Sequence, residues 1–229
     1  MKKILILLAA LPIIGTAKGQ EVRDLLQKVK VKYDMVNDYT ATGKMKTNVI
    51  FIKAPVATVK VYYKRPDKLK IKNESGVSFI PKGSVNVNMN NVLGLSNYEA
   101  IPGGTEKISG TDCRVIKIFP LSDEESIARA TLYIDEKQLL VMKSVISTKE
   151  NGTYELLMAY KKFATYGLPD KVELTFNTKD YKLPKGITVD YDNGTSKDNA
   201  DKLKNKKGKV EITYSDYQIN KGVPDSVFK

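Results

Sequence analysis

The chain has 229 residues, of which 41% are hydrophobic and 28% are charged, and its formal net charge is +12. It contains no histidine, which removes the usual general base, the Ser-His-Asp and Cys-His nucleophile pairs and most zinc sites. Its single cysteine, Cys113, cannot form an internal disulfide. We therefore expect a protein that is not an enzyme, in which Cys113 is a buried apolar residue, with a free thiol as the alternative.

An export signal opens the sequence. Two lysines precede an apolar run over residues 4–15, and Thr16-Ala17-Lys18-Gly19 supplies the small residues of a cleavage site. Because a transmembrane helix needs roughly 20 apolar residues, this run is too short to span a bilayer stably, and an uncleaved anchor is the less favoured alternative. We expect cleavage near Gly19 and, since no linker composition follows, one soluble domain over residues 20–229.

The first element expected in the mature chain is a helix. Between Gln20 and Tyr39, apolar residues recur at the i, i+3, i+4 and i+7 spacing of one helix face. The stripe consists of Val22, Leu25, Leu26, Val29, Tyr33, Val36 and Tyr39. Because the stripe is narrow, we expect this helix to lie against one face of a larger element.

After residue 38 the apolar residues alternate, which predicts short antiparallel strands. Turn sequences separate the strands, among them Pro102-Gly103-Gly104 and the hairpin sequence Asn151-Gly152. Residues 90–98 break the alternation and are expected to form a short helix or a loop over the sheet. The strands are expected over 39–51, 59–65, 68–72, 76–80, 85–89, 113–119, 128–135, 139–147, 153–163, 171–177 and 209–217. About ten strands and one or two helices indicate a meandering, barrel-like sheet.

Residues 180–208 are polar and charged, which predicts an exposed insertion. The acidic residues over 190–201 are compatible with a calcium site. However, the glycine does not stand at the position that an EF-hand loop requires, and no glutamate closes the loop, which favours an ordinary acidic loop. The lysines of 202–209 come without an aromatic RNA-binding motif, and no phosphate-binding glycine motif occurs in the chain. We expect no metal, no cofactor and no nucleic acid partner.

A charge interrupts an apolar pattern near residue 65. One strand face carries, in order, Val59, Val61, Tyr63 and Arg65. The alternation extends to Arg65 because a residue before proline is held in an extended conformation. An unpaired charge on an apolar face is costly, so we expect Arg65 to face the apolar side and to bond to carbonyl oxygens or a carboxylate.

The expected sheet has more apolar surface than the expected helices cover. Such a curved sheet should keep an apolar cavity or an exposed apolar patch, and a fully packed core without a ligand is the alternative. The densest carboxylate cluster, Asp123-Glu124-Glu125, follows Pro120 in a predicted loop. We interpret it as a solvated turn, and a hydrolase that uses it is the least favoured hypothesis.

Several segments resemble the LolA-like outer-membrane lipoprotein-sorting proteins. The resemblance covers most of the mature chain and is most specific at Lys64-Arg65-Pro66, at the end of a strand. The other matching pieces are Tyr39-x-Ala41-x-Gly43, Tyr62-Tyr63, Asp67-Lys68-Leu69, Ile108-Ser109-Gly110-Thr111-Asp112-Cys113-Arg114-Val115, Leu132-Tyr133-Ile134-Asp135 and Asn220-Lys221-Gly222-Val223-Pro224-Asp225-Ser226-Val227-Phe228.

The resemblance implies an α+β, mainly β fold, an incomplete antiparallel β-barrel (half-barrel) with a helical lid on its concave face. It also implies a monomeric, non-enzymatic carrier in the periplasm that binds the acyl chains of lipoproteins, or another lipid. Such a carrier takes part in sorting lipoproteins from an inner-membrane donor to an outer-membrane acceptor. The fold also resembles periplasmic regulators that sense mislocalised lipoproteins and control an anti-sigma factor, so a sensor or interaction module is the alternative function.

The resemblance also implies roles for individual residues. In the family, the arginine of Lys-Arg-Pro bonds to the lid and favours the closed, empty state, and an apolar residue four positions later helps to accept and pass on cargo. Here these positions are Arg65 and Leu69, a leucine where the family commonly has phenylalanine. The lipid-binding and lid residues expected from the sequence are therefore Arg65, Leu69, Tyr63, Val61 and Val59.

Overall fold

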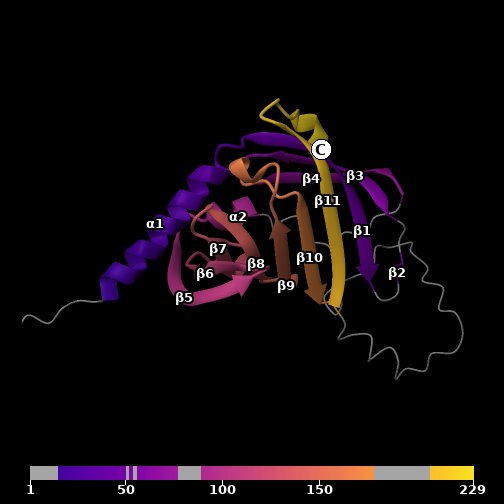
Figure 1. The fold of residues 1–229 in the computed structure, drawn as a ribbon. Helices are drawn as coiled ribbons and strands as arrows, with labels where there is room; N and C mark the ends of the chain where they lie inside the picture. The colour runs from indigo at the N-terminus through magenta and orange to yellow at the C-terminus, as the bar shows by residue number, and fades with distance from the viewer. Residues whose placement is uncertain (1–14, 50–51, 54–55, 77–88, 178–206) are drawn as a thin grey trace, which may run out of the picture.

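The computed structural model describes residues 15–49, 52–53, 56–76, 89–177 and 207–229. In this part of the chain, eleven strands form one antiparallel sheet that curls around two α-helices (Figure 1). The elements are α1 (Gly15–Tyr33), β1 (Asp38–Val49), β2 (Ile52–Lys53), β3 (Ala57–Lys64), β4 (Lys68–Ser75), α2 (Met89–Leu93), β5 (Tyr98–Ile108), β6 (Thr111–Pro120), β7 (Ile127–Asp135), β8 (Leu140–Thr148), β9 (Gly152–Ala159), the 3₁₀ helix η2 (Ala164–Tyr166), β10 (Lys171–Asn177), β11 (Lys207–Ile219) and the 3₁₀ helix η4 (Asp225–Phe228).

The sheet is open, with β4 at one edge and β5 at the other. Strands β5 to β11 pair successively as a meander, β11 then pairs with β1, and β3 and β4 complete the order beyond β1. The short strand β2 pairs with β1. Because the two edge strands are not neighbours in the described sheet, the barrel is incomplete. The prediction of a mainly β protein with an incomplete antiparallel barrel is confirmed.

The pairing of β1 with β11 joins the two ends of the sequence and was not predicted. Ala41 faces Tyr217 across this pair, and the register shifts between Thr42 and Gly43. A Cβ atom at Gly43 would lie 2.9 Å from the Thr213 carbonyl oxygen, closer than side chains approach a backbone atom. A glycine is therefore required where β1 bends against β11.

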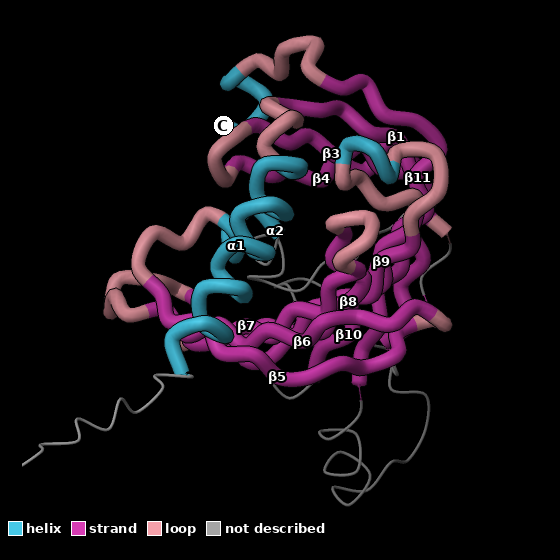
Figure 2. The backbone as a smooth tube through the Cα atoms, turned by 60° about the vertical axis from the view of Figure 1, so that its left-hand side comes forward, coloured by secondary structure: helices cyan, strands magenta, loops and turns pink. Residues whose placement is uncertain are grey.

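Helix α1 lies across the concave side of the sheet (Figure 2). Its buried stripe of Val22, Leu25, Leu26 and Val29 packs toward β5, α2 and η2. The predicted helix over 20–39 is too long, because α1 ends at Tyr33 and Tyr39 is already in β1. No helix in the described ranges is long and apolar enough to cross a membrane.

The apolar spacing continued past Tyr33 for a physical reason. Val36 is buried in the same core as the α1 stripe, although it lies in the connection to β1. The backbone of this connection bonds elsewhere, since the Asn37 N–H donates to the Asn220 side-chain oxygen at 2.7 Å and the Asn220 amide donates to the Met35 carbonyl at 2.9 Å. The apolar stripe in the sequence therefore predicted correctly which residues are buried, but it did not predict where the helix ends.

Three further boundaries differ from the predictions. The expected turn Pro102-Gly103-Gly104 lies inside β5, where the register shifts opposite β6, so it is a bulge. The strand expected over 153–163 ends at Ala159. Met89, expected in a strand over 85–89, begins α2, which confirms the short helix that was one alternative for 90–98.

Parts of the predicted insertion, of three predicted strands and of the predicted export signal lie outside the described residues, namely 178–206, 77–88, 50–51 and 1–14. The end of the insertion was placed too late, since Lys207 and Gly208 belong to β11. A Cβ atom at Gly208 would lie 2.5 Å from the Phe176 ring, so a larger residue here would require the ring to move. The composition around Gly208 indicated a loop, because glycine and lysine are both uncommon in strands.

Cys113 lies on β6 and is fully buried, as predicted. Its thiol donates a weak hydrogen bond to the Thr111 carbonyl oxygen at 3.5 Å. Burial raises the pKa of the Cys113 thiol, which keeps it protonated and unreactive at neutral pH. The residue therefore serves packing of the sheet.

Candidate functional site

A cavity of about 160 Å³ lies between the concave face of the sheet and the helices. It is lined mainly by aliphatic and aromatic side chains from both arms of the curled sheet, from α1 and α2, and from the segment after η2. The lining residues are Tyr33, Tyr39, Met45, Val61, Tyr63, Leu69, Ile71, Met89, Asn90, Leu156, Met158, Tyr160, Gly167, Leu168, Pro169, Val172, Leu174, Val210, Ile212, Tyr214 and Tyr217.

Tyrosine hydroxyl groups tie the cavity walls together. The Tyr160 hydroxyl donates to the Val141 carbonyl oxygen at 2.8 Å, so its 2.9 Å contact with Tyr33 is a bond in which Tyr33 donates. Through Tyr160, the residue after β9, this bond links α1 to β8. The Tyr217 hydroxyl similarly donates to the Pro169 carbonyl oxygen at 2.8 Å. These tyrosines are structural parts of the wall.

Two other cavity tyrosines differ. Among the described residues, the hydroxyl groups of Tyr39 and Tyr214 have no hydrogen-bond partner, and both rings pack against Tyr217, with centroids 5.3 and 5.0 Å away. Burial raises the pKa of Tyr39 and of Tyr214 well above the usual value for tyrosine. Both groups therefore stay protonated at neutral pH and can donate a hydrogen bond to a ligand in the cavity.

The structure brings together three of the five site residues expected from the sequence. Val61, Tyr63 and Leu69 all line the cavity, because β3 pairs with β4 and places Leu69 opposite Tyr63. Val59 is fully buried on the same face of β3 but belongs to the packed core and not to the lining. The alternation along β3 thus predicted the inward face correctly.

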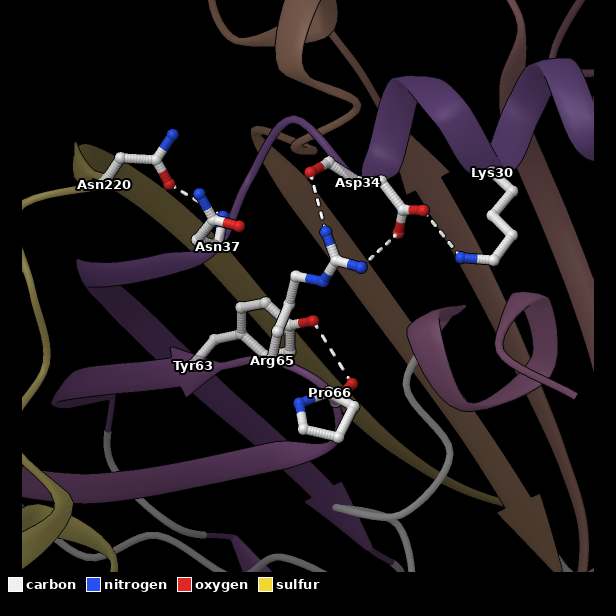
Figure 3. Close-up of polar contacts among 7 residues, drawn as sticks. All are labelled: Lys30, Asp34, Asn37, Tyr63, Arg65, Pro66 and Asn220. Atoms are coloured by element: carbon white, nitrogen blue, oxygen red, sulfur yellow. Dashed lines mark hydrogen bonds and ion pairs between the residues drawn. The ribbon is translucent and has the colours of Figure 1, made fainter.

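Arg65 lies at the rim of the cavity and does not face its apolar side (Figure 3). The expected orientation is wrong because β3 ends at Lys64, one residue before the corner that contains the cis peptide bond Arg65-Pro66. The expected partners are present. Nη1 donates to the Asp34 carbonyl oxygen at 2.9 Å, and Nη2 lies 3.3 Å from the Asp34 carboxylate.

The position of Asp34 explains why an arginine suits this rim. Asp34 follows α1, and its N–H still bonds to the Lys30 carbonyl, so its own carbonyl marks the negative C-terminal end of the helix. Its carboxylate also pairs with the Lys30 amine at 2.6 Å. The Arg65 backbone N–H donates to the Asn37 carbonyl at 2.9 Å. Arg65 therefore joins the β3–β4 corner to the end of α1 through its side chain, and to the connection between α1 and β1 through its backbone.

A second hollow, which we call the polar cleft, adjoins the cavity at this rim. It measures about 460 Å³ and shares Tyr63 and Asn90 with the cavity wall. Its lining includes the charged residues Lys30, Asp34, Arg65, Asp67, Glu124 and Glu125. The predicted acidic cluster therefore contributes two residues to the cleft, whereas Asp123 points outward and lies 3.8 Å from the Lys149 amine.

Sequence reasoning missed Asp34, Asn220, Tyr39 as a lining residue, and Tyr214. Asp34 had a weak local signal, since it stands four residues after Lys30 at the end of a predicted helix. Asn220 has a positive φ of 55°, which asparagine tolerates, and it clamps the connection between α1 and β1. Within the described ranges, no group of three or more potential metal ligands is close enough to hold an ion.

No family model matches the sequence, and no curated protein matches it. Solved structures match the fold. A Vibrio parahaemolyticus domain named for outer membrane lipoprotein sorting has a TM-score of 0.58 at 11% identity, with 92% of this chain and 97% of that chain covered. A DUF1329 family protein from Desulfovibrio piger has a TM-score of 0.57 at 14% identity, with 93% and 97% covered. A LolA superfamily protein from Nitrosomonas europaea has a TM-score of 0.56 at 9% identity, with 91% and 97% covered. The chain therefore has the LolA-like fold.

Proposed function

We propose that the protein is a non-enzymatic carrier that binds the acyl chains of lipoproteins in the apolar cavity. In this proposal it works in the periplasm, where it takes lipoproteins from an inner-membrane donor and passes them to an outer-membrane acceptor. The fold supports the proposal, because the Vibrio domain that shares it is named for lipoprotein sorting. The predicted export signal agrees with this location.

The observation that carries the proposal is the apolar cavity between the sheet and the helices. Burying an acyl chain there is favourable, because each methylene removed from water contributes about 0.8 kcal/mol. A cavity of about 150 Å³ holds a molecule the size of benzene, so the cavity must widen for an acyl chain. Binding therefore requires α1 and α2 to move relative to the sheet.

The contacts of α1 are unequal on its two sides, which suggests how the cavity opens. Toward β5 and β6 the helix buries its apolar stripe, and Glu21 pairs with Arg114 at 2.9 Å. Toward β3 and β4, it is joined through Asp34 to the half-exposed Arg65. Since exposed ion pairs contribute little, we propose that the lid opens by parting this second side.

The free hydroxyl groups of Tyr39 and Tyr214 give the cavity a polar feature. An acyl chain of a lipoprotein is attached through an ester or amide carbonyl, which accepts hydrogen bonds but cannot donate through its oxygen. We place that carbonyl near the two hydroxyl groups, with the hydrocarbon extending toward Leu69 and Leu174. A carboxylate could also accept these hydrogen bonds, but it would lose its hydration in an apolar cavity, a cost that a neutral ester does not carry.

Binding of matched lipopeptides tests the proposal. The protein without residues 1–19 is titrated with a diacylated peptide and with the same peptide lacking acyl chains, and complexes are counted by native mass spectrometry. We expect a one-to-one complex with the acylated peptide alone. Equal binding of the two peptides, or binding of neither, would contradict the proposal.

A further inference from the structure

On the outward face of the sheet, most lysines of β8 to β11 have acidic partners among the described residues, whereas most lysines of β1, β3 and β4 do not. We call these two groups of strands the two arms of the sheet. Strands β8 to β11 contain four lysines and four acidic residues. Their ion pairs cross from strand to strand, with Nζ to carboxylate distances of 2.9, 2.7 and 3.5 Å. The pairs are Lys171 with Glu211, Lys209 with Glu173, and Lys143 with Glu155. This arm is electrically balanced.

Strands β1, β3 and β4 contain seven lysines and two acidic residues. Lysines face lysines across β3 and β4, since Lys60 is opposite Lys72 and Lys64 is opposite Lys68. Like charges directly opposite one another destabilise a sheet. Asp225 of η4 compensates one of these pairs, lying 3.1 Å from the Lys64 amine and 2.9 Å from the Lys68 amine. The other pair has no such compensation.

Four lysines of this arm, Lys44, Lys46, Lys60 and Lys72, have no acidic partner among the described residues, and we call them the basic surface. The Lys44 amine bonds to the Thr58 hydroxyl at 2.7 Å, and the Lys72 amine lies 5.6 Å from the centre of the Tyr62 ring. Neither contact neutralises charge.

The basic surface extends over three neighbouring strands, β1, β3 and β4, and faces away from the helices. Lys60 lies between the inward-facing Val59 and Val61, and its neighbour on β4 is Lys72. Lys44 and Lys46 lie on the adjacent strand β1 and are exposed. Neighbouring strands are about 4.8 Å apart, so the directly opposed Lys60 and Lys72 lie within the screening length of about 8 Å at physiological salt, and Lys44 and Lys46 extend the same positive face along β1.

We propose that the basic surface binds an anionic lipid bilayer. The amines are spread over a strand face and do not converge on a hollow, which suits a plane of phosphates better than a single phosphate group. Each lysine adds to the attraction between this face and an anionic surface. In the free protein, the unpaired lysines only lower the stability of the sheet, so their arrangement is of use only when an anionic partner is bound. Contact with a membrane would bring the protein to the surface on which lipids are loaded or delivered.

Vesicle flotation tests this proposal without any acyl ligand. The protein without residues 1–19 is mixed with vesicles of phosphatidylcholine alone, or with an equal mixture of phosphatidylcholine and phosphatidylglycerol, at low and high salt. We expect binding to the mixed vesicles only, with a decrease as salt rises. Equal binding to both vesicle types, or binding that salt does not weaken, would overturn the proposal.

Two matched variants locate the surface. In the first, Lys44, Lys46, Lys60 and Lys72 are all replaced by glutamine, and the partition to mixed vesicles should fall by about two to three orders of magnitude, since each lysine near an anionic surface contributes about 1 kcal/mol. In the second, the same replacement is made at the four lysines of the balanced arm. That variant has the same net charge and should keep most of the binding. The replaced residues are Lys143, Lys171, Lys207 and Lys209.

Equal losses in the two variants would overturn the assignment to the basic surface, because net charge alone would then explain the binding. The single replacement Lys60→Gln gives a second readout that does not involve membranes. It removes a like-charge pair, so the melting temperature should stay the same or rise. A lower melting temperature would show that Lys60 has a structural role, and the argument from unpaired charge would fail.

Discussion

The apolar cavity and the polar cleft adjoin each other and share Tyr63 and Asn90, yet their chemistry is opposite. The cavity is surrounded by apolar side chains and tyrosines, whereas the cleft is lined by charges at the end of α1, at the β3–β4 corner, and at Glu124 and Glu125 in the loop before β7. The change occurs over two residues at the end of β3, from Tyr63 in the strand to Arg65 in the corner after it. The alternation of β3 sends Tyr63 inward, and the end of β3 at Lys64 frees Arg65 to turn toward the cleft.

This difference indicates that one set of residues, in the cavity, governs binding of the acyl chain, and that a neighbouring set, in the cleft, governs opening of the lid. Changes in the cavity should alter affinity for an acyl chain. Changes in the cleft should alter how fast the helices part from the sheet, with less effect on what is bound. The following predictions test that division.

The largest effect should come from a charge in the cavity. Leu69→Glu places a carboxylate at a half-buried lining position, where an ionised group is poorly solvated and cannot coexist with hydrocarbon. Affinity for the diacylated peptide should fall by about tenfold or more, because the charge must stay solvated or be neutralised. The matched change in the cleft, Asp67→Asn, should leave the affinity nearly unchanged. Similar losses in both variants would break the proposed division.

Burial of tyrosines around the cavity should make the free energy of unfolding depend on pH in the alkaline range. Burial raises the pKa of Tyr33 to about 12, above the ordinary value of 10, so the unfolded chain loses this proton first as pH rises. The contribution is fully present below pH 10 and is lost between pH 10 and 12, with a decrease of about 2–3 kcal/mol in the free energy of unfolding.

Urea unfolding at several pH values measures this change, and ultraviolet absorbance follows tyrosinate formation. The variant Tyr33→Phe should lose less stability over the same pH interval than the unmodified protein. If all tyrosines of the folded protein ionised together near pH 10, the desolvated cavity would be contradicted.

A moderate effect is expected at the rim. Arg65→Leu removes both contacts to Asp34, which should weaken closure of the lid. Because the closed cavity is too small for an acyl chain, weaker closure favours the open, loaded state, and acyl release should slow by about fivefold, within the range of exposed charge pairs. Stopped-flow dissociation of a fluorescent lipopeptide measures the rate. Lys64→Leu is the control, because Lys64 pairs with Asp225 and not with α1. Identical release from unmodified protein and Arg65→Leu would rule out the lid role.

The smallest effect should come from the cavity hydroxyl groups. Replacing Tyr39 and Tyr214 by phenylalanine keeps the rings and removes two donors, so binding of an acyl ester should weaken about threefold to tenfold, as expected for the loss of a hydrogen bond. Binding of an alkane without oxygen should not change. Tyr133→Phe, whose ring lies 5.2 Å from the Lys143 amine, is the control. Equal weakening for ester and alkane would assign both hydroxyl groups to packing alone.

The strands were predictable where one face is buried, because burial imposes the alternation that sequence displays. Strand β10 was predicted with its observed bounds, and the inward residues of β3 were identified correctly. The end of α1 was missed, and so was the whole of β5 with its bulge at Pro102, because no strand was predicted between residues 90 and 112. In both cases the local pattern was present, but residues distant in sequence determined the backbone conformation. These are Asn220 for the connection after α1, and β6 for the strand around Pro102.

The site was predictable only in part for the same reason. Val61, Tyr63 and Leu69 are close in sequence, so the hairpin of β3 and β4 placed them together. Tyr214 and Asp34 reach the site through the pairing of β1 with β11 and through the end of α1. No local periodicity records such long-range pairing. The sequence indicated that Arg65 needs a partner, and the structure identifies that partner as Asp34.

Photo-crosslinking tests the central claim most directly, that an acyl chain occupies the apolar cavity. A diacylated peptide with a diazirine near the end of one acyl chain is bound to the protein, irradiated, and the labelled positions are mapped by mass spectrometry. We predict labels on the inward residues of β4, β9 and β10, in particular Leu69, Met158 and Leu174. Labels confined to outward-facing residues, or no more label than with a peptide lacking acyl chains, would contradict the claim.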